Sequence, residues 1–140
     1  MPVEMGRKRP RKAQCACGGL RLEMIGEPLS VYLCHCDACK RITGSAFAYR
    51  ARYSASAIAG LSGEPRSWRR SGDSGHWVEH VFCGTCGTTM FLRGERLGGD
   101  IVVSGGIFAD PEFPPPGAAY YRDRELLWMH SVTSGHGGLK

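Results

Sequence analysis

The chain has 140 residues, 42% of them apolar, which is enough to bury one core of ordinary size but too little for two domains. Its net charge of +5 comes from the basic segment at residues 7–12, because from Ala13 onward 13 basic residues stand against 12 acidic ones. The composition therefore disfavours a broad basic surface for nucleic acid, and the lack of any run of about 18 apolar residues predicts no membrane-spanning helix.

The sequence predicts a single folded domain with a short extension at each end. Residues 1–13 are expected to form a disordered basic arm, with an electrostatic contact to nucleic acid or an anionic surface as the alternative. The domain is expected at residues 14–132, followed by a flexible tail at 133–140. Seven cysteines without an apolar secretory signal predict a reducing compartment, and hence a cytoplasmic protein.

Short apolar stretches among 20 glycines and eight prolines predict a mainly β domain with many turns. Apolar and charged residues alternate over residues 20–24, and a second alternating stretch at 31–33 leads into a cysteine cluster, so both are predicted strands. Residues 38–44 suit a short helical turn that ends at Gly44. Residues 45–53 are a further predicted strand.

The second half of the chain continues this pattern of short elements. The small residues at 55–60 are compatible with a helix of one or two turns. Strands are predicted at residues 76–83, 88–93 and 100–108. A rigid loop is expected at residues 110–119, because its three successive prolines fix φ and donate no backbone hydrogen bond.

Cysteines supply the strongest functional signal, and they fall into three groups. CACGG carries Cys15 and Cys17, CHCDAC carries Cys34, Cys36 and Cys39, and FCGTCG carries Cys83 and Cys86. Clustered thiols in a reducing compartment more often bind zinc than form disulfides. A structural zinc takes four protein ligands, whereas a catalytic zinc takes three and keeps one position open. Seven sulfurs therefore predict two zinc ions per chain, one structural and one catalytic.

Spacing alone leaves the division of the sulfurs open. One arrangement joins the FCGTCG pair to Cys36 and Cys39, as in a zinc ribbon. The other joins the FCGTCG pair to the CACGG pair and leaves the three cysteines of CHCDAC as a local set. We favour the second arrangement, since three neighbouring sulfurs can converge without help from distant parts of the chain.

The motifs, in this order, resemble those of a known family. The matching segments are CACGGLRLE, YLCHCDACKRITGSAFA, LSGEP, HVFCGTCGTTMF, and GGIFADPEF with ELLWM, and they run from about Gln14 to Met129. Together they resemble the glutathione-dependent formaldehyde-activating enzymes, also described as S-(hydroxymethyl)glutathione synthases, a family that includes centromere protein V. The resemblance implies a small two-sheet β-tent fold related to the methionine sulfoxide reductase B group.

The resemblance also implies the second division of ligands. The structural zinc would then be held by Cys15, Cys17, Cys83 and Cys86. The catalytic zinc would be held by Cys34, Cys36 and Cys39. A thiol that enters the open position would lose its proton, and its sulfur could add to formaldehyde or depart from an adduct. This implies a carbon–sulfur lyase or synthase with glutathione as its small-molecule thiol.

Residues next to the CHCDAC group are candidates for further roles. The carboxylates of glutathione need cationic or N–H partners, for which the candidates are Lys40, Arg41, and the backbone at Gly44 and Ser45. A solvated basic pair beside a glycine cap is the alternative. His35 is a candidate for proton transfer or for a structural hydrogen bond.

Three other histidines are candidates for the fourth position of the catalytic zinc, where any one of them would silence the site. They are His76, His80 and His130. A silent site would favour the alternative function, a non-catalytic zinc-stabilised binding module whose basic arm contacts a partner. A lyase that acts on the adduct of another low-molecular-weight thiol is the second alternative.

Overall fold

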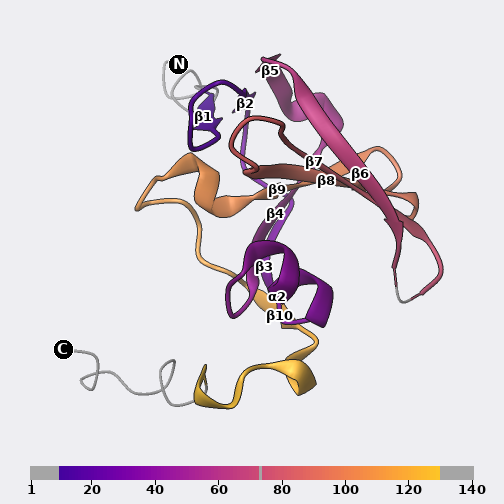
Figure 1. The fold of residues 1–140 in the computed structure, drawn as a ribbon. Coiled ribbons are helices and arrows are strands. Elements are labelled where there is room, and N and C mark those ends of the chain that lie inside the picture. Colours follow the sequence, from indigo (N-terminus) through magenta and orange to yellow (C-terminus); the bar gives the residue numbers. More distant parts are fainter. Residues whose placement is uncertain (1–9, 73, 130–140) are drawn as a thin grey trace.

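The computed structural model describes residues 10–72 and 74–129, which fold into two β-sheets with few helical turns (Figure 1). The small sheet has the order β1 (Arg11–Gln14), β2 (Arg21–Met24), β5 (Ile58–Ser62). The large sheet has the order β10 (Ala118–Tyr120), β3 (Ser30–Cys34), β4 (Ala48–Ser54), β9 (Asp100–Ser104), β8 (Thr89–Gly94), β7 (Trp77–Cys83), β6 (Pro65–Ser71). The prediction of a mainly β, two-sheet domain is confirmed.

Helix α2 (Asp37–Thr43) follows β3 almost directly and lies near β3 and β10 in Figure 1. Its N-cap is Cys36, whose Sγ accepts a hydrogen bond from the backbone N–H of Cys39. Gly44 ends the helix in the left-handed region at φ 65°, a conformation that glycine adopts without a Cβ clash. The helical turn predicted at 38–44 is therefore confirmed. None of the helices in the described ranges is long and apolar enough to cross a membrane.

The core lies between the two sheets and is built by one face of each. Successive side chains of a strand point to opposite faces, so the register places Ala51, Val103, Phe91 and Val81 in one row across four strands of the large sheet. All four are at most 2% exposed and belong to the same core as Leu22 of the small sheet. Burying a valine, leucine or phenylalanine side chain stabilises the fold by about 1.5–3 kcal/mol.

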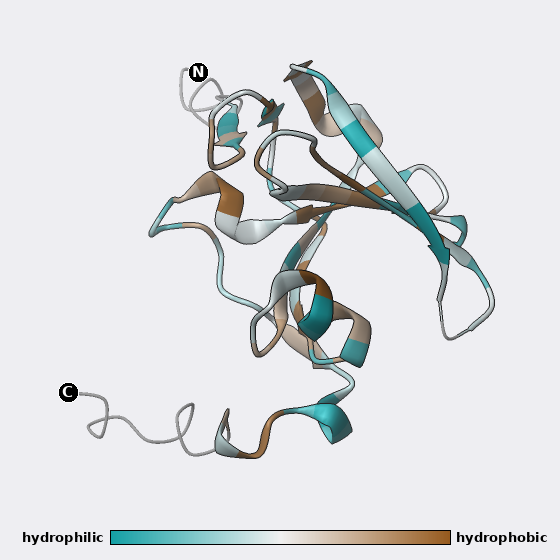
Figure 2. Cartoon of the chain, in the orientation of Figure 1, coloured by the Kyte–Doolittle hydropathy of each residue, from teal (hydrophilic) through white to brown (hydrophobic). Residues whose placement is uncertain are grey.

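The opposite face of the large sheet carries polar and aromatic side chains. Its rows join Tyr32 to Arg50 on β3 and β4, and Leu92 through His80 to Trp68 on β8, β7 and β6. Hydrophilic colours dominate along β6, one of the two edge strands of the large sheet, whereas hydrophobic ones mark the strands near the centre (Figure 2). The strand period thus leaves this face available for a site.

Two elements differ from the sequence prediction around the small sheet. The predicted helix at 55–60 is wrong, because only residues 55–57 form a 3-10 turn and Ile58–Ser62 form β5. Pairing with β2 overrides the weak helical preference of these small residues. Arg11, Lys12 and Ala13, assigned to the disordered arm, form β1 with Gln14 and pair with β2. Residues 1–9 of the predicted arm and the 133–140 tail lie outside the described residues.

Three features of the large sheet also depart from the prediction. Strand β6 was not predicted, and it pairs with β7 along its whole length. The segment predicted as a strand at 100–108 ends at Ser104, where a 3-10 turn begins. The loop predicted at 110–119 gives way at Ala118 to β10, which pairs in parallel with β3.

Candidate metal centres and the adjoining cavity

The four-cysteine cluster comprises Cys15, Cys17, Cys83 and Cys86, whose sulfurs all lie within 4.8 Å of one another. Sγ of Cys17 lies 3.6 Å from Sγ of Cys15 and 3.8 Å from Sγ of Cys83. A tetrahedral zinc with Zn–S bonds of about 2.3 Å requires sulfurs about 3.8 Å apart. None of the seven cysteines of the chain is in a disulfide. The spacing and the free thiols therefore fit a zinc ion with four sulfur ligands.

Backbone N–H groups point at these sulfurs, as expected for tight turns around a metal. The N–H of Leu20 donates to Sγ of Cys15 at 3.2 Å, and the N–H groups of Thr85 and Cys86 donate to Sγ of Cys83 at 3.4 and 3.5 Å. Hydrogen bonds of this kind favour the anionic form of a thiol. The hydroxyl of Thr88 likewise lowers the pKa of Cys86 to about 5.

The four-cysteine cluster joins the two sheets. Cys15 and Cys17 lie in the turn between β1 and β2 of the small sheet, whereas Cys83 ends β7 and Cys86 lies in the turn before β8. Sulfurs 66 residues apart in sequence thus meet at one point. A metal held there would tie the sheets together, which suits a structural role.

The three-cysteine cluster comprises Cys34, Cys36 and Cys39, whose sulfurs also lie within 4.8 Å of one another. Cys34 ends β3, Cys36 caps α2 and Cys39 lies in its first turn, so one strand–helix connection supplies the whole set. In the part of the chain that the structure describes, no fourth Cys, His, Asp or Glu joins it. The fold therefore brings the sulfurs together in the second of the two arrangements that spacing left open.

A buried arginine contacts this cluster. Arg50 is 3% exposed, and its Nη2 donates to Sγ of Cys39 at 3.6 Å. The pKa of Cys39 is lowered to about 5, first by the hydrogen bond from the Cys34 thiol and then by the charge of Arg50. The pKa of Cys34 is raised, first because its thiol donates a hydrogen bond to Cys39 and then because the thiol is buried. Cys39 is thus the first of the three to carry a thiolate.

His35 lies beside the cluster but outside both the set of sulfurs and the cavity next to them. Its side chain is 2% exposed, and its ring centre lies 5.8 Å from that of Phe47. Its backbone N–H donates to the carbonyl of Tyr120, which ties the start of α2 to β10. This placement supports a packing role and gives no support to proton transfer by His35.

The two other described histidines do not complete the three-cysteine cluster. His80 accepts a hydrogen bond at Nε2 from Nε of Arg70 at 3.1 Å. His76 Nδ1 lies 3.3 Å from a carboxylate oxygen of Glu95. His130 lies outside the described residues. Neither described histidine therefore occupies the fourth position.

A cavity of about 230 Å³ adjoins the three sulfurs. Besides the cysteines, its principal lining side chains are Tyr32, Arg50, Arg70, Leu92 and Tyr121. Burial raises the pKa of Tyr32 to about 12, so its hydroxyl stays protonated at neutral pH and can donate a hydrogen bond. Tyr121 reaches this wall from the left-handed region at φ 58°, a conformation that costs a non-glycine residue about 1 kcal/mol.

The residues predicted to bind the carboxylates of a thiol do not line this cavity. Lys40 donates through Nζ to the carbonyl of Arg124 at 2.6 Å, Arg41 is exposed, and Gly44 and Ser45 lie at the far end of α2. The cationic groups that line the cavity are instead Arg50 and Arg70, which the sequence prediction missed. The sequence did contain an indication of where Arg50 points, because strand alternation places it on the other face of the strand from Tyr49 and Ala51.

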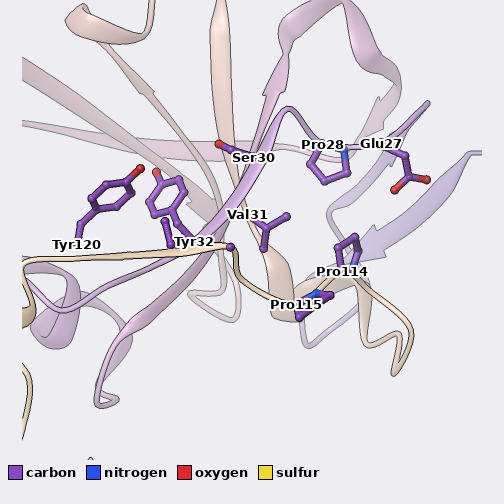
Figure 3. A pocket seen from close by; sticks show the side chains of 10 residues that line it. Glu27, Pro28, Ser30, Val31, Tyr32, Pro114, Pro115 and Tyr120 are labelled. Atoms are coloured by element: carbon purple, nitrogen blue, oxygen red, sulfur yellow. The ribbon is translucent and has the colours of Figure 1, made fainter. Parts of the chain in front are cut away.

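A second and larger cavity, of about 430 Å³, lies between β3 and the proline loop (Figure 3). Its walls are mainly proline and tyrosine, and the rings of Tyr32 and Tyr120 meet edge to face with centres 5.1 Å apart. Its one carboxylate, on Glu27, pairs with Arg11 at 2.9 Å. This cavity is lined by no sulfur, so it lacks the candidate metal ligands that line the smaller cavity.

Comparisons with known proteins give a family match and a related fold. The model of a family described as glutathione-dependent formaldehyde-activating enzyme matches residues 10–124. A crystal structure of a Rhodobacter sphaeroides protein superposes with a TM-score of 0.58 at 20% sequence identity, covering 77% of this chain and 98% of that one. At that identity the likeness concerns the fold alone. No curated protein matches the chain.

Proposed function

Because this chain belongs to the glutathione-dependent formaldehyde-activating enzyme family, we propose that it makes or breaks the carbon–sulfur bond between a small thiol and formaldehyde. Glutathione is the proposed thiol and S-(hydroxymethyl)glutathione the proposed adduct. The observation that carries the proposal is the three-cysteine cluster, which opens onto a cavity and gains no fourth ligand from the described residues. The proposed activity is that of a zinc-dependent carbon–sulfur lyase or synthase.

The donor set of this cluster fits zinc. Three thiols within 4.8 Å of one another match the soft ligands that zinc prefers, and the N–H of Cys39 supports Sγ of Cys36 at 3.3 Å. Cys34, Cys36 and Cys39 would hold the ion. When bound, zinc supplies Lewis acidity that keeps a substrate thiol deprotonated at neutral pH.

The chain's own residues would bind and orient the reactants. Leu92 and Val78 give the cavity an apolar wall that excludes water from part of the site. The Tyr32 hydroxyl, held protonated by burial, can donate a hydrogen bond to the oxygen of formaldehyde, which gains negative charge as the carbon–sulfur bond forms. In the reverse direction, the proton of the adduct's hydroxyl group would leave to water as the carbon–sulfur bond breaks, and the Tyr32 hydroxyl would donate a hydrogen bond to the oxygen that becomes the carbonyl of formaldehyde.

The test is the rate at which glutathione and formaldehyde exchange with their adduct, measured by proton NMR exchange spectroscopy on the zinc-loaded full chain. The uncatalysed reaction supplies the background rate, so the measurement compares rates at a fixed equilibrium. The native chain is expected to raise both the forward and the reverse rate without changing the equilibrium constant.

The matched control is Cys36→Ser, which removes one sulfur at the cavity and leaves the four-cysteine cluster intact. Its exchange rate is expected to fall to the background. Equal rates for the native chain and this variant, both folded by circular dichroism, would contradict the proposed activity. That outcome would leave a zinc-stabilised binding module as the better description.

A further inference from the structure

The cavity beside the three-cysteine cluster contains a buried positive charge that no carboxylate among the described residues neutralises. Arg50 is almost fully buried, yet no ion pair among the described residues includes it. Its side-chain partner is Sγ of Cys39, at 3.6 Å. A buried guanidinium is costly unless an anion faces it, and here the sulfurs are the anions within reach. Arg50 therefore offsets negative charge at the cluster.

A second guanidinium, that of Arg70, lines the same cavity. It comes from β6 at the edge of the large sheet, whereas Arg50 comes from β4. Arg70 extends from β6, where its Nε donates to His80 Nε2 at 3.1 Å and its Nη1 lies 3.5 Å from the carbonyl of Ser71. Its Nη2 has no partner in the described ranges. His80 cannot neutralise it, since an imidazole that accepts this hydrogen bond is uncharged.

The described lining of the cavity contains two guanidinium groups and no carboxylate. Three thiolates around a divalent ion carry a net charge of −1, and a thiolate ligand would bring this to −2, which one arginine does not fully offset. An anionic group elsewhere on the ligand would then depend on the second arginine. Arginine is suited to this task because its planar fork can bind a carboxylate through two hydrogen bonds.

We propose that this cavity selects thiols that carry a carboxylate, with Arg50 supporting the sulfur end of the ligand and Arg70 binding the carboxylate. Tyr32, which lines the same cavity, supplies a further donor. The proposal rests on the proposed function, because it requires that a thiol enter at the three-cysteine cluster. It assigns the selection of the thiol to β6, a strand that lies outside the cysteine motifs and α2.

Isothermal titration of the zinc-loaded full chain with 3-mercaptopropionate and with 3-mercaptopropionamide tests the proposal. The two probes have the same size and the same thiol, and they differ in whether the far end is charged. The native chain is expected to bind the acid at least about tenfold more tightly than the amide, a ratio that corresponds to about 1.4 kcal/mol.

Substitutions on β6 identify the residue responsible. Arg70→Gln is expected to bring the acid-to-amide ratio close to one by weakening binding of the acid more than binding of the amide, and Arg70→Lys is expected to keep part of the preference. Arg69→Gln is the matched control: it removes the same charge from the next residue, whose guanidinium stacks on Trp77 at 3.9 Å and does not line the cavity. It should retain the full preference.

The possible outcomes distinguish carboxylate selection from thiol binding at the three-cysteine cluster. Equal binding of acid and amide by the native chain would overturn the inference while leaving thiol binding in place. A preference that Arg70→Gln retains, or that Arg69→Gln loses equally, would overturn the role of Arg70. If neither probe binds, the inference fails together with the proposed function.

Discussion

Loss of one sulfur from the four-cysteine cluster should destabilise the fold far more than loss of one from the three-cysteine cluster. Cys83 is 4% exposed, and its Sγ lies 3.8 Å from Sγ of Cys17 in the other sheet. Cys36 is half-buried, and its partners Cys34 and Cys39 belong to the same short segment. The two substitutions, Cys83→Ser and Cys36→Ser, therefore remove cross-links of very different span.

The magnitude follows from the length of chain that each cross-link closes. On the loop-length relation for covalent cross-links, closing a loop of 66 residues contributes about 4 kcal/mol, whereas closing a loop within residues 34–39 contributes about 2 kcal/mol. Native domains are stable by about 5–15 kcal/mol, so the first loss is a large fraction of the total. At about 4 °C per kcal/mol for a chain of this size, Cys83→Ser should melt about 8 °C below Cys36→Ser.

Thermal unfolding followed by circular dichroism, with two equivalents of zinc present, measures the difference. The native chain should melt highest, Cys36→Ser next and Cys83→Ser lowest. Melting temperatures that agree for the two variants would refute the assignment of separate structural and catalytic clusters, because the two cross-links close loops of very different length.

Two further predictions concern packing and pH. Gly105→Ala should destabilise the fold by about 1–3 kcal/mol, because the added Cβ would lie 2.7 Å from ring atoms of Tyr49. In Gly106→Ala the added Cβ meets nothing within 4 Å, so this variant should unfold at nearly the same urea concentration as the native chain. Equal urea midpoints for the two variants would contradict this prediction. Burial, followed by the charge of Arg70 and Arg50, lowers the pKa of His80 to about 4. Between about pH 6.5 and 4 the unfolded chain therefore binds more protons at this residue than the folded chain does, so the free energy of unfolding falls as the pH falls through that window. His80→Gln should show a shallower decline in unfolding free energy from pH 7 to 5 than the native chain, and an identical decline would count against this shift.

Sequence reasoning succeeded where the signal is local. The alternation of apolar residues located β2, β3, β7 and β8, and Gly44 located the end of α2. Cysteine spacing predicted zinc and two sites but left the division of ligands open. That division depends on which turns the sheets bring together, and residues 66 apart cannot be placed beside one another by local pattern alone.

The missed residues are those whose role depends on strand pairing. Arg70 belongs to β6, a strand of mostly exposed polar residues without the apolar alternation that reveals a strand in sequence. Arg50 stands in a correctly predicted strand, but its proximity to Cys39 follows from the pairing of β4 with β3. The error at β5 has a related cause, because small residues with no clear period take the conformation that their partner strand requires.

The most direct test of the central claim is zinc X-ray absorption spectroscopy on the full chain loaded with two zinc ions, before and after addition of glutathione. We predict seven protein sulfurs shared between the two ions, with an eighth sulfur appearing in the scattering when the thiol binds. A scattering pattern that glutathione leaves unchanged, or one that already shows both ions with four protein ligands, would contradict an open thiol-binding position at the three-cysteine cluster.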